Sequence, residues 1–254
     1  MVDLRQKLAE GACIYGTMLV ELHTPNIVYM LKKVGFDYLI VDCEHGYFDY
    51  YMVANIIAAA KGADLPILVR IPGTGREPIL KYVEMGAAGL LVPMVSQAED
   101  VQTVIKHCKY APLGSRGVST TRAHTGYHVD DLRTYMDQAN ADIVVLGQIE
   151  SLQGLEHISE ILDVAGLDGL IVGPNDLSQD MDIINQYGHP RMKAAIQTIV
   201  EASRSKQRWT GIITSDTALL LECQELGMQV LSWNSEVGMM IQGGQAGLGR
   251  LKKL

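Results

Sequence analysis

The sequence lacks the residue patterns that mark several large classes of protein. Its 254 residues include only four cysteines, Cys13, Cys43, Cys108 and Cys223, and none belongs to a CxxC motif or a Cys/His cluster. A zinc ribbon or a disulfide framework is therefore not expected, and four free thiols fit a reducing compartment. The formal net charge of -8 offers no broad basic surface for nucleic acid, although a local pocket can still bind a small anion.

Long hydrophobic runs are also missing. The longest apolar stretches, such as Gly89–Val95, have the length of a strand and are too short to cross a membrane. The charged amino-terminal segment MVDLRQKLAEG lacks the apolar core of a secretory signal. We therefore expect a cytoplasmic protein that does not contact a membrane.

Short apolar runs alternate with longer segments of helical periodicity. Nearly continuous apolar strands indicate burial on both faces, and strict strand–helix alternation indicates βαβ units. Eight strands predict an α/β protein, a (β/α)8 TIM barrel built as one domain over residues 1–254. A doubly wound sheet is the alternative, but no GxGxxG motif follows the first strand. The expected strands are Cys13–Val20, Tyr38–Asp42, Ile67–Arg70, Gly89–Pro93, Ile143–Ile149, Gly169–Val172, Gly211–Ile213 and Val230–Ser232.

The segments between these strands predict the helices and one irregular region. Lys109–Tyr127, which contains Arg116 and Arg122, predicts a long loop over one end of the barrel. The glycine-rich carboxyl-terminal segment does not directly follow an expected strand, so we expect a tail there rather than a phosphate loop. Its glycines are Gly243, Gly244, Gly247 and Gly249. The expected helices are Asn26–Val34, Met52–Lys61, Pro78–Met85, Ala98–Cys108, Gly154–Leu162, Met192–Arg204 and Thr217–Leu226.

Two acids stand where a barrel places its chemistry, at the carboxyl ends of strands. Glu150 follows the fifth expected strand and Asp176 the sixth, so they would be neighbours around the ring. Two carboxylates suit a hard cation such as Mg²⁺ or Mn²⁺, whereas zinc favours histidine or cysteine. Each acid equally suits a helix N-cap or first turn, and spacing does not separate the two interpretations. The backbone N–H groups of Asn175 and Asp176 are placed to bind a carboxylate.

Two further strand ends carry ionisable side chains. Arg70 closes an apolar strand, where a cation is costly unless it meets an anion. That anion is either a substrate or a nearby carboxylate such as Glu44 or Glu150. His45 follows the second strand and is placed to carry protons near neutral pH, although a lone histidine is more often structural. No lysine ends a strand, so a Schiff base is not expected.

The segments around these residues resemble one known family. In chain order they read GFDYLIVDCEHGYFD, ILVRIPG, GAAGLLVPMV, APLGSRGVS, GQIES and GLDGLIVGPNDLS. They are similar to the HpcH/HpaI family of class II pyruvate aldolases, whose members include 2-dehydro-3-deoxyglucarate aldolase and 4-hydroxy-2-oxoheptanedioate aldolase. The resemblance extends from Gly16 to Gly238. The six segments in this order are specific to the family, whereas any one of them alone would be weak support.

The resemblance implies the fold, the assembly and the metal. It implies a (β/α)8 barrel that forms a homo-oligomer, a hexamer or a dimer, with a C-terminal helix exchanged between subunits. It implies that Glu150 and Asp176 bind a divalent metal cation, either Mg²⁺ or Mn²⁺, with Co²⁺ as a further candidate. The implied activity is cleavage or formation of 4-hydroxy-2-oxo acids, which yields pyruvate and an aldehyde.

The resemblance also implies roles for individual side chains. Arg70 matches the family arginine that holds the pyruvate oxygen, and Gln148 matches a glutamine that lines the pyruvate pocket. His45 matches the catalytic histidine, which in the family is paired with an aspartate on the helix before the fourth strand. Glu84 stands at that aspartate position here. A glutamate can also orient the imidazole of His45, but its side chain is longer than that of the family aspartate.

Other departures lie where a second substrate would bind. The first strand continues into TMLVELHTP with Met18 and Glu21, Asn175 replaces the usual small residue before Asp176, and SWNSE introduces Trp233 and Asn234. These changes leave the identity of the aldehyde open. The alternatives are a citrate-forming or CoA-ester lyase enzyme on the same scaffold, or a non-catalytic barrel that binds a 2-oxo acid.

Overall fold

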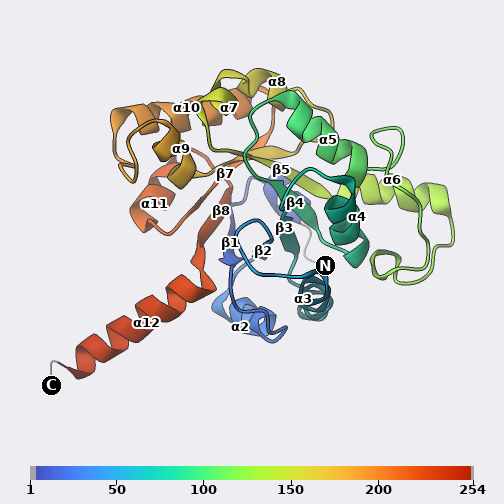
Figure 1. Cartoon of the computed structure of the whole chain (residues 1–254), viewed down its shortest axis with the longest axis horizontal. Coiled ribbons are helices and arrows are strands. Elements are labelled where there is room, and N and C mark those ends of the chain that lie inside the picture. The colour runs from blue at the N-terminus through green and yellow to red at the C-terminus, as the bar shows by residue number, and fades with distance from the viewer. Residues whose placement is uncertain (1–3, 253–254) are drawn as a thin grey trace.

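Eight short, buried strands pair in sequence order and close into a parallel barrel, in a computed structural model that describes residues 4–252 (Figure 1). Every neighbouring pair is parallel, including β1 with β8. The predicted (β/α)8 architecture is therefore confirmed. The strands are β1 (Ile14–Leu19), β2 (Tyr38–Asp42), β3 (Ile67–Arg70), β4 (Gly89–Val92), β5 (Val144–Ile149), β6 (Gly169–Val172), β7 (Trp209–Thr214) and β8 (Val230–Ser235).

Helices surround the barrel, and their apolar faces pack on the outside of the strands (Figure 1). The barrel-facing helices are α2 (Ile27–Val34), α3 (Tyr50–Ala63), α4 (Arg76–Met85), α5 (Ala98–Cys108), α7 (Leu152–Glu156), α8 (Ile158–Leu162), α10 (Pro190–Ser205) and α11 (Thr217–Glu225). The single helix expected over Gly154–Leu162 is in fact two, because the chain turns at His157. Several helices end at a glycine in the left-handed conformation, such as Gly35 after α2 and Gly86 after α4.

A second core fills the inside of the barrel. Its twelve buried residues include Leu4 and Leu8 of the short helix α1 (Leu4–Ala9), which join side chains from the strands. Tyr38 points across this core, and a Cβ at Gly16 would lie 2.4 Å from its ring. Gly16 is therefore required for Tyr38 to fit, and the filled interior leaves the chemistry to the ends of the barrel.

Two helices of eleven residues or more lie outside those that the periodicity predicts, and the second is at the position of the C-terminal helix that the resemblance implies. The long αβ connection after α5 contains the 3-10 turn η1 (Ala123–Thr125), as part of the expected loop, and then α6 (Leu132–Asp142). The expected C-terminal tail is instead α12 (Glu236–Leu251), which projects away from the barrel (Figure 1). The tail prediction was wrong because the glycines there outweighed two stronger signals. Ser235 caps the first turn by accepting from the Gly238 N–H, and no proline interrupts the segment.

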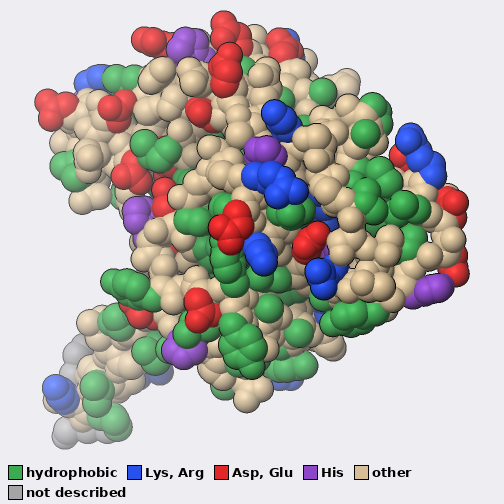
Figure 2. Space-filling view, turned by 45° about the vertical axis from the view of Figure 1, so that its right-hand side comes forward, with side chains coloured by type: hydrophobic (Ala, Val, Ile, Leu, Met, Phe, Trp, Pro, Cys, Tyr) green, Lys and Arg blue, Asp and Glu red, His purple; other side chains and the backbone are tan. Residues whose placement is uncertain are grey.

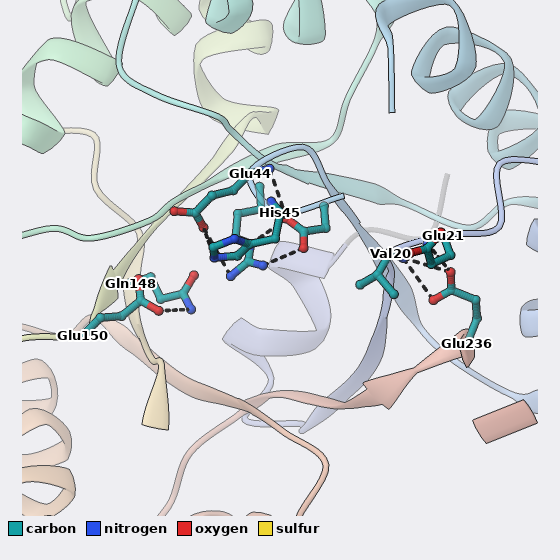
Figure 3. A network of polar contacts seen from close by, with 9 residues as sticks. Val20, Glu21, Glu44, His45, Gln148, Glu150 and Glu236 are labelled. Atoms are coloured by element: carbon teal, nitrogen blue, oxygen red, sulfur yellow. Dashed lines mark hydrogen bonds and ion pairs between the residues drawn. The ribbon is translucent and has the colours of Figure 1, made fainter. Parts of the chain in front are cut away.

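The base of α12 is fixed to the rim of the barrel. Glu236 is buried, and its carboxylate accepts backbone N–H groups from Val20, Glu21 and Leu22 at 2.7–3.0 Å (Figure 3). Three consecutive N–H groups converging on one carboxylate form an anion nest. The loop after β1 and the start of α12 are therefore held as one unit.

The surface in Figure 2 mixes charges of both signs. Acidic and basic side chains are interspersed on this face rather than separated into one extended basic surface of the kind that nucleic acid requires (Figure 2). Within residues 4–252, none of the helices combines the length and hydropathy needed to cross a bilayer.

Candidate active site

A polar cluster gathers at the carboxyl ends of β2, β3 and β5. Asp42 and Arg70 end neighbouring strands and are partners in the strand register. Gln148 lies near the end of β5, and Glu150 directly follows that strand. Figure 3 shows Gln148 and Glu150 side by side, extending toward Glu44 and His45. Parallel strands thus bring residues from distant parts of the sequence to one edge, as the barrel prediction requires.

Arg70 is held mainly by Asp42. Its Nε donates to Asp42 Oδ1 at 2.9 Å, and its Nη2 donates to Asp42 Oδ2 at 2.6 Å. A second acid, Glu44, lies 3.4 Å from Nη1 through its Oε2. The sequence predicts Glu44 or Glu150 as the protein partner of Arg70, and Glu44 is indeed nearby. The main partner, Asp42, is not among the predicted ones, although it is an acid that ends the strand next to that of Arg70. The two-pronged contact fixes the guanidinium plane, since both Asp42 and Arg70 are buried.

Asp42 also shapes the loop that carries His45. Its Oδ1 accepts the backbone N–H groups of Glu44 at 3.1 Å and His45 at 3.2 Å. The imidazole of His45 is 71% exposed, with Nε2 3.8 Å from Glu44 Oε2. Close packing below this loop leaves no room for a Cβ at Gly46, which would meet the Asp42 carbonyl at 2.3 Å. One buried carboxylate therefore orients both Arg70 and the base of the His45 loop.

Glu150 is buried and held at both oxygens. Gln148 Nε2 donates to Oε1 at 2.8 Å, and the Met94 backbone N–H donates to Oε2 at 2.9 Å. Burial raises the pKa of Glu150 to about 7, an effect that the Met94 hydrogen bond opposes and the nearby charge of Asp176 reinforces. Gly173 gives the carboxylate its space, because a Cβ there would lie 2.3 Å from Glu150 Oε1.

Asp176 and Asn175 begin the short helix α9 (Pro174–Asp180), just after β6. Both are exposed. Burial is the main reason that the pKa values of Glu150 and Glu44 are raised, and the nearby charge of Asp176 adds a smaller contribution to each. The Asn175 side chain accepts a hydrogen bond from the Tyr187 hydroxyl. The structure thus brings Asp176 to the same end of the barrel as Glu150, while the Asn175 amide already has a protein partner.

Glu84 is not brought to His45 within the chain. It lies in the last turn of α4, which leads into the amino end of β4, whereas His45 follows the carboxyl end of β2. The carbonyl of Glu84 instead accepts from His124 Nδ1 at 3.1 Å. The expected His45–Glu84 pair is therefore absent from the single chain, because helix ends and strand ends of the same polarity lie at opposite ends of the barrel.

The departures near the first and last strands occupy different environments. Met18 is buried in the barrel interior, and Glu21 is exposed on the loop held by Glu236. Trp233 donates its indole N–H to Thr217 at 3.2 Å, and Asn234 adopts a positive φ of 59°. Of the four, Glu21 is the side chain left most open to a second substrate.

Residues 4–252 contain no group of three or more His, Cys, Asp or Glu that could hold a metal ion. The two carboxylates Glu150 and Asp176 therefore offer at most a partial coordination shell. Beside them, Gln148 Oε1 is buried and has no hydrogen-bond partner. Buried oxygens without partners are rare and call for a ligand or water. Two acids that repel each other and an unmatched amide oxygen together suit a hard cation completed by ligand or water oxygens.

Comparison with known proteins gives the site its context. Residues 17–243 match the family model described as HpcH/HpaI aldolase/citrate lyase. The chain is 30% identical to the hydroxypyruvate/pyruvate aldolase of Roseobacter denitrificans over 95% of this chain and 94% of that protein. It is 30% identical to the 4-hydroxy-2-oxo-heptane-1,7-dioate aldolase of Salmonella dublin over 85% of this chain and 82% of that protein.

A solved structure agrees along almost the whole chain. The crystal structure of an HpcH/HpaI aldolase from Desulfitobacterium hafniense superposes with a TM-score of 0.95 at 32% identity, covering 99% of this chain and 97% of that one. The sequence match and the shared barrel agree, so the chain belongs to the HpcH/HpaI aldolase/citrate lyase family.

Proposed function

We propose that the chain is a class II aldolase that cleaves, and in reverse forms, 4-hydroxy-2-oxo acids, with pyruvate and an aldehyde as products. The observation that carries the proposal is the arrangement at one barrel mouth of a fixed Arg70, a buried Glu150 and an unmatched Gln148 Oε1. The relatives named for pyruvate and 4-hydroxy-2-oxo acids support the same substrate class.

Glu150 and Asp176 would hold the metal ion, with Mg²⁺ or Mn²⁺ favoured by the all-oxygen donor set and Co²⁺ as a further candidate. The family is divalent-metal dependent. When bound, such a cation supplies Lewis-acid stabilisation of the negative charge that cleavage develops on the ketone oxygen of pyruvate. The hydrogen bonds from Gln148 and Met94 keep the Glu150 carboxylate in one orientation for this role.

Arg70 would bind and stabilise the pyruvate end of the substrate. Asp42 occupies Nε and Nη2 and fixes the guanidinium plane. Nη1, which lies 3.4 Å from Glu44 Oε2, carries two N–H groups and would donate one of them to the ketone oxygen. Gln148 would line the same pocket. The backbone N–H groups of Asn175 and Asp176 would receive the carboxylate.

His45 would remove the proton from the C4 hydroxyl and so begin carbon–carbon bond cleavage. The Glu44 carboxylate at 3.8 Å stabilises the imidazolium that forms. The bond between C3 and C4 then breaks, its electrons pass to the pyruvate fragment, and the aldehyde leaves. Return of a proton to the methyl carbon completes pyruvate. Glu84 is a candidate to assist His45 only if another subunit supplies it, since the two are separated within one chain.

The experiment is metal-dependent deuterium exchange into the methyl group of pyruvate, followed by a panel of aldehydes that includes succinic semialdehyde, tartronate semialdehyde and glycolaldehyde. We expect exchange with Mg²⁺ or Mn²⁺ that stops in chelator and returns on adding metal. Full exchange and cleavage in chelator would show the metal mechanism to be wrong.

A condensing enzyme that forms citrate, or a CoA-ester lyase, is the second candidate because the family description includes citrate lyase. Turnover of oxaloacetate or acetyl-CoA, with no aldol cleavage, would favour it. Pyruvate binding without methyl proton exchange would instead indicate a non-catalytic barrel.

We also propose that the chain forms a homo-oligomer, a hexamer or a dimer, in which α12 packs on another subunit. The support is the exposure of apolar side chains along this projecting helix: Met240 at 61%, Ile241 at 50%, Leu248 at 56% and Leu251 at 67%. The free state of all four cysteines suits a cytoplasmic location. Light scattering of the full chain and of a chain ending before α12 tests the assembly.

A further inference from the structure

A cavity lies at the opposite end of the barrel from the candidate active site. It encloses about 340 Å³ between the end of α4, the η1 turn and α6. Its walls include Val144, at the amino end of β5, and Pro66, just before β3. None of the residues given a role in the proposed reaction lines it. Within one chain, a ligand here would therefore bind apart from the residues that carry the proposed reaction.

Arg116 lines this cavity and is only 5% exposed. Its guanidinium stacks on the Tyr110 ring at 4.6 Å, while Nε and Nη2 have no hydrogen-bond partner. Among residues 4–252 no carboxylate lies within ion-pair distance of it. A buried guanidinium without an anion is costly, and its planar donors match the oxygens of a carboxylate or a phosphate.

His124 supplies the opposite kind of group. Its Nδ1 lies 3.1 Å from the Glu84 carbonyl, which only accepts, so Nδ1 carries the proton. The other nitrogen, Nε2, is buried without a partner and is an acceptor in the neutral ring. Burial and the nearby Arg116 lower the pKa of His124, which favours that neutral form. The cavity thus presents donors and one acceptor.

The other charges in the wall leave a positive balance. Arg5 is paired with Asp168 at 2.8 Å. Asp142 accepts from the neutral Gln138 amide at 2.6 Å, so it keeps its negative charge and offsets one of the two remaining cations. Lys61 donates to the Ala123 carbonyl at 2.8 Å and brings a second cation beside Arg116.

We propose that this cavity binds a small oxyanion, a phosphate or a hydroxycarboxylate, whose charged oxygens meet Arg116 and Lys61 and whose hydroxyl proton is donated to His124 Nε2. The proposal does not depend on the aldolase reaction. It is tested on the full chain without metal or pyruvate, so that its failure leaves the proposed function untouched.

The test is isothermal titration calorimetry with sodium phosphate, sodium L-lactate and sodium sulfate, each at matched ionic strength. Sulfate carries no proton near neutral pH and cannot donate to His124. We expect saturable binding of phosphate or lactate, with weaker binding of sulfate, and the stronger of the first two identifies the ligand class. Arg116→Met should weaken binding at least tenfold. Arg122→Met removes the same charge from an exposed position of the same loop and should change binding less than twofold.

A second measurement avoids reliance on folded variants. Hydrogen–deuterium exchange of the unmodified chain should slow in the connection from 109 to 131 when phosphate or lactate is added, and stay unchanged around Asp42 and Glu150. Equal weakening by Arg116→Met and Arg122→Met would overturn the proposal, because it would show a general effect of charge. Absence of saturable binding, or protection confined to the carboxyl end of the barrel, would overturn it as well.

Discussion

Two buried arginines, one at each end of the same barrel, differ in what surrounds them. Arg70 has two nitrogens bound by Asp42 and a third near Glu44. Arg116 has an aromatic ring below it and two nitrogens without partners. Most of the donors of Arg70 are already used, which fixes its orientation, whereas Arg116 has both Nε and Nη2 free of protein partners. The carboxyl end therefore pairs its groups in advance, and the amino end leaves a cation available.

The largest effect is expected from Glu150 at the carboxyl end. Glu150→Gln keeps the shape of the side chain but removes half of the proposed carboxylate pair. Cleavage of a 4-hydroxy-2-oxo acid should fall by about 10³-fold, since metal ions supply several kcal/mol of transition-state stabilisation. Glu160→Gln, an exposed change on α8, is the matched control and should leave the rate unaltered. Retention of more than a tenth of the activity in Glu150→Gln would contradict the metal role.

Removing the partner of Arg70 should destabilise the fold. Asp42→Asn leaves a buried guanidinium without its counter-charge, and breaking such a pair costs about 3 kcal/mol of the free energy of unfolding. Urea denaturation followed by circular dichroism measures the change. A loss below about 1 kcal/mol, typical of an exposed ion pair, would show that Arg70 is better solvated than its burial indicates.

Gly173→Ala tests the space around Glu150. The new methyl group would lie on Glu150 Oε1 and turn the carboxylate away. Metal affinity should fall about 10–100-fold, the usual result of disturbing the support of a ligand. Calorimetric titration of Mn²⁺ measures it. Gly188→Ala, at a position where a Cβ meets nothing within 4 Å, serves as the control and should bind metal normally.

The raised pKa of Glu150 predicts a pH dependence at the same end. Below the pKa of about 7 the folded carboxyl holds a proton that a metal ion must displace, so metal affinity should fall about tenfold per pH unit as pH falls. Without metal, the folded chain holds this proton between its usual pKa of 4.5 and 7 while the unfolded chain has lost it. Stability of the metal-free protein should therefore decrease as pH rises through that window.

Titrations of Mn²⁺ from pH 5.5 to 8 give the slope. Metal affinity that does not change across this range would show that Glu150 is ionised throughout, and would remove burial as the dominant influence on it.

The smallest effect is expected at the amino end. Arg116→Met removes a guanidinium that is not paired with a carboxylate, so no buried anion is left without its partner. Methionine can continue the contact with the Tyr110 ring. In the absence of ligand we expect the free energy of unfolding to stay unchanged or to rise by about 1 kcal/mol, because the substitution removes the desolvation cost of an unmatched buried charge. A loss of unfolding free energy as large as that of Asp42→Asn would mean that Arg116 is as firmly paired as Arg70. The two arginines would then not differ in the way described above.

Sequence periodicity predicted the strands well because most of them are short, buried apolar runs with glycine or a polar step beside them. The same signal failed at α12, where glycine content outweighed a serine cap, and at α6, where exposed polar residues hid the helical face. Strand ends predicted that Arg70, Gln148 and Glu150 would lie at one edge. Asp42 was missed because its importance depends on strand register. The pairing of Glu84 with His45 is not formed within one chain and stays a prediction that requires a second subunit.

The nest around Glu236 has a consequence for the projecting helix. Because Glu236 in its first turn is hydrogen-bonded to the backbone of Val20, Glu21 and Leu22, the base of α12 is held in a fixed orientation relative to the barrel. The direction of the helix axis is therefore set by the loop that contains Glu21. A displacement of the far end of α12 would therefore be transmitted through Glu236 to the backbone of the loop after β1, at the mouth of the barrel.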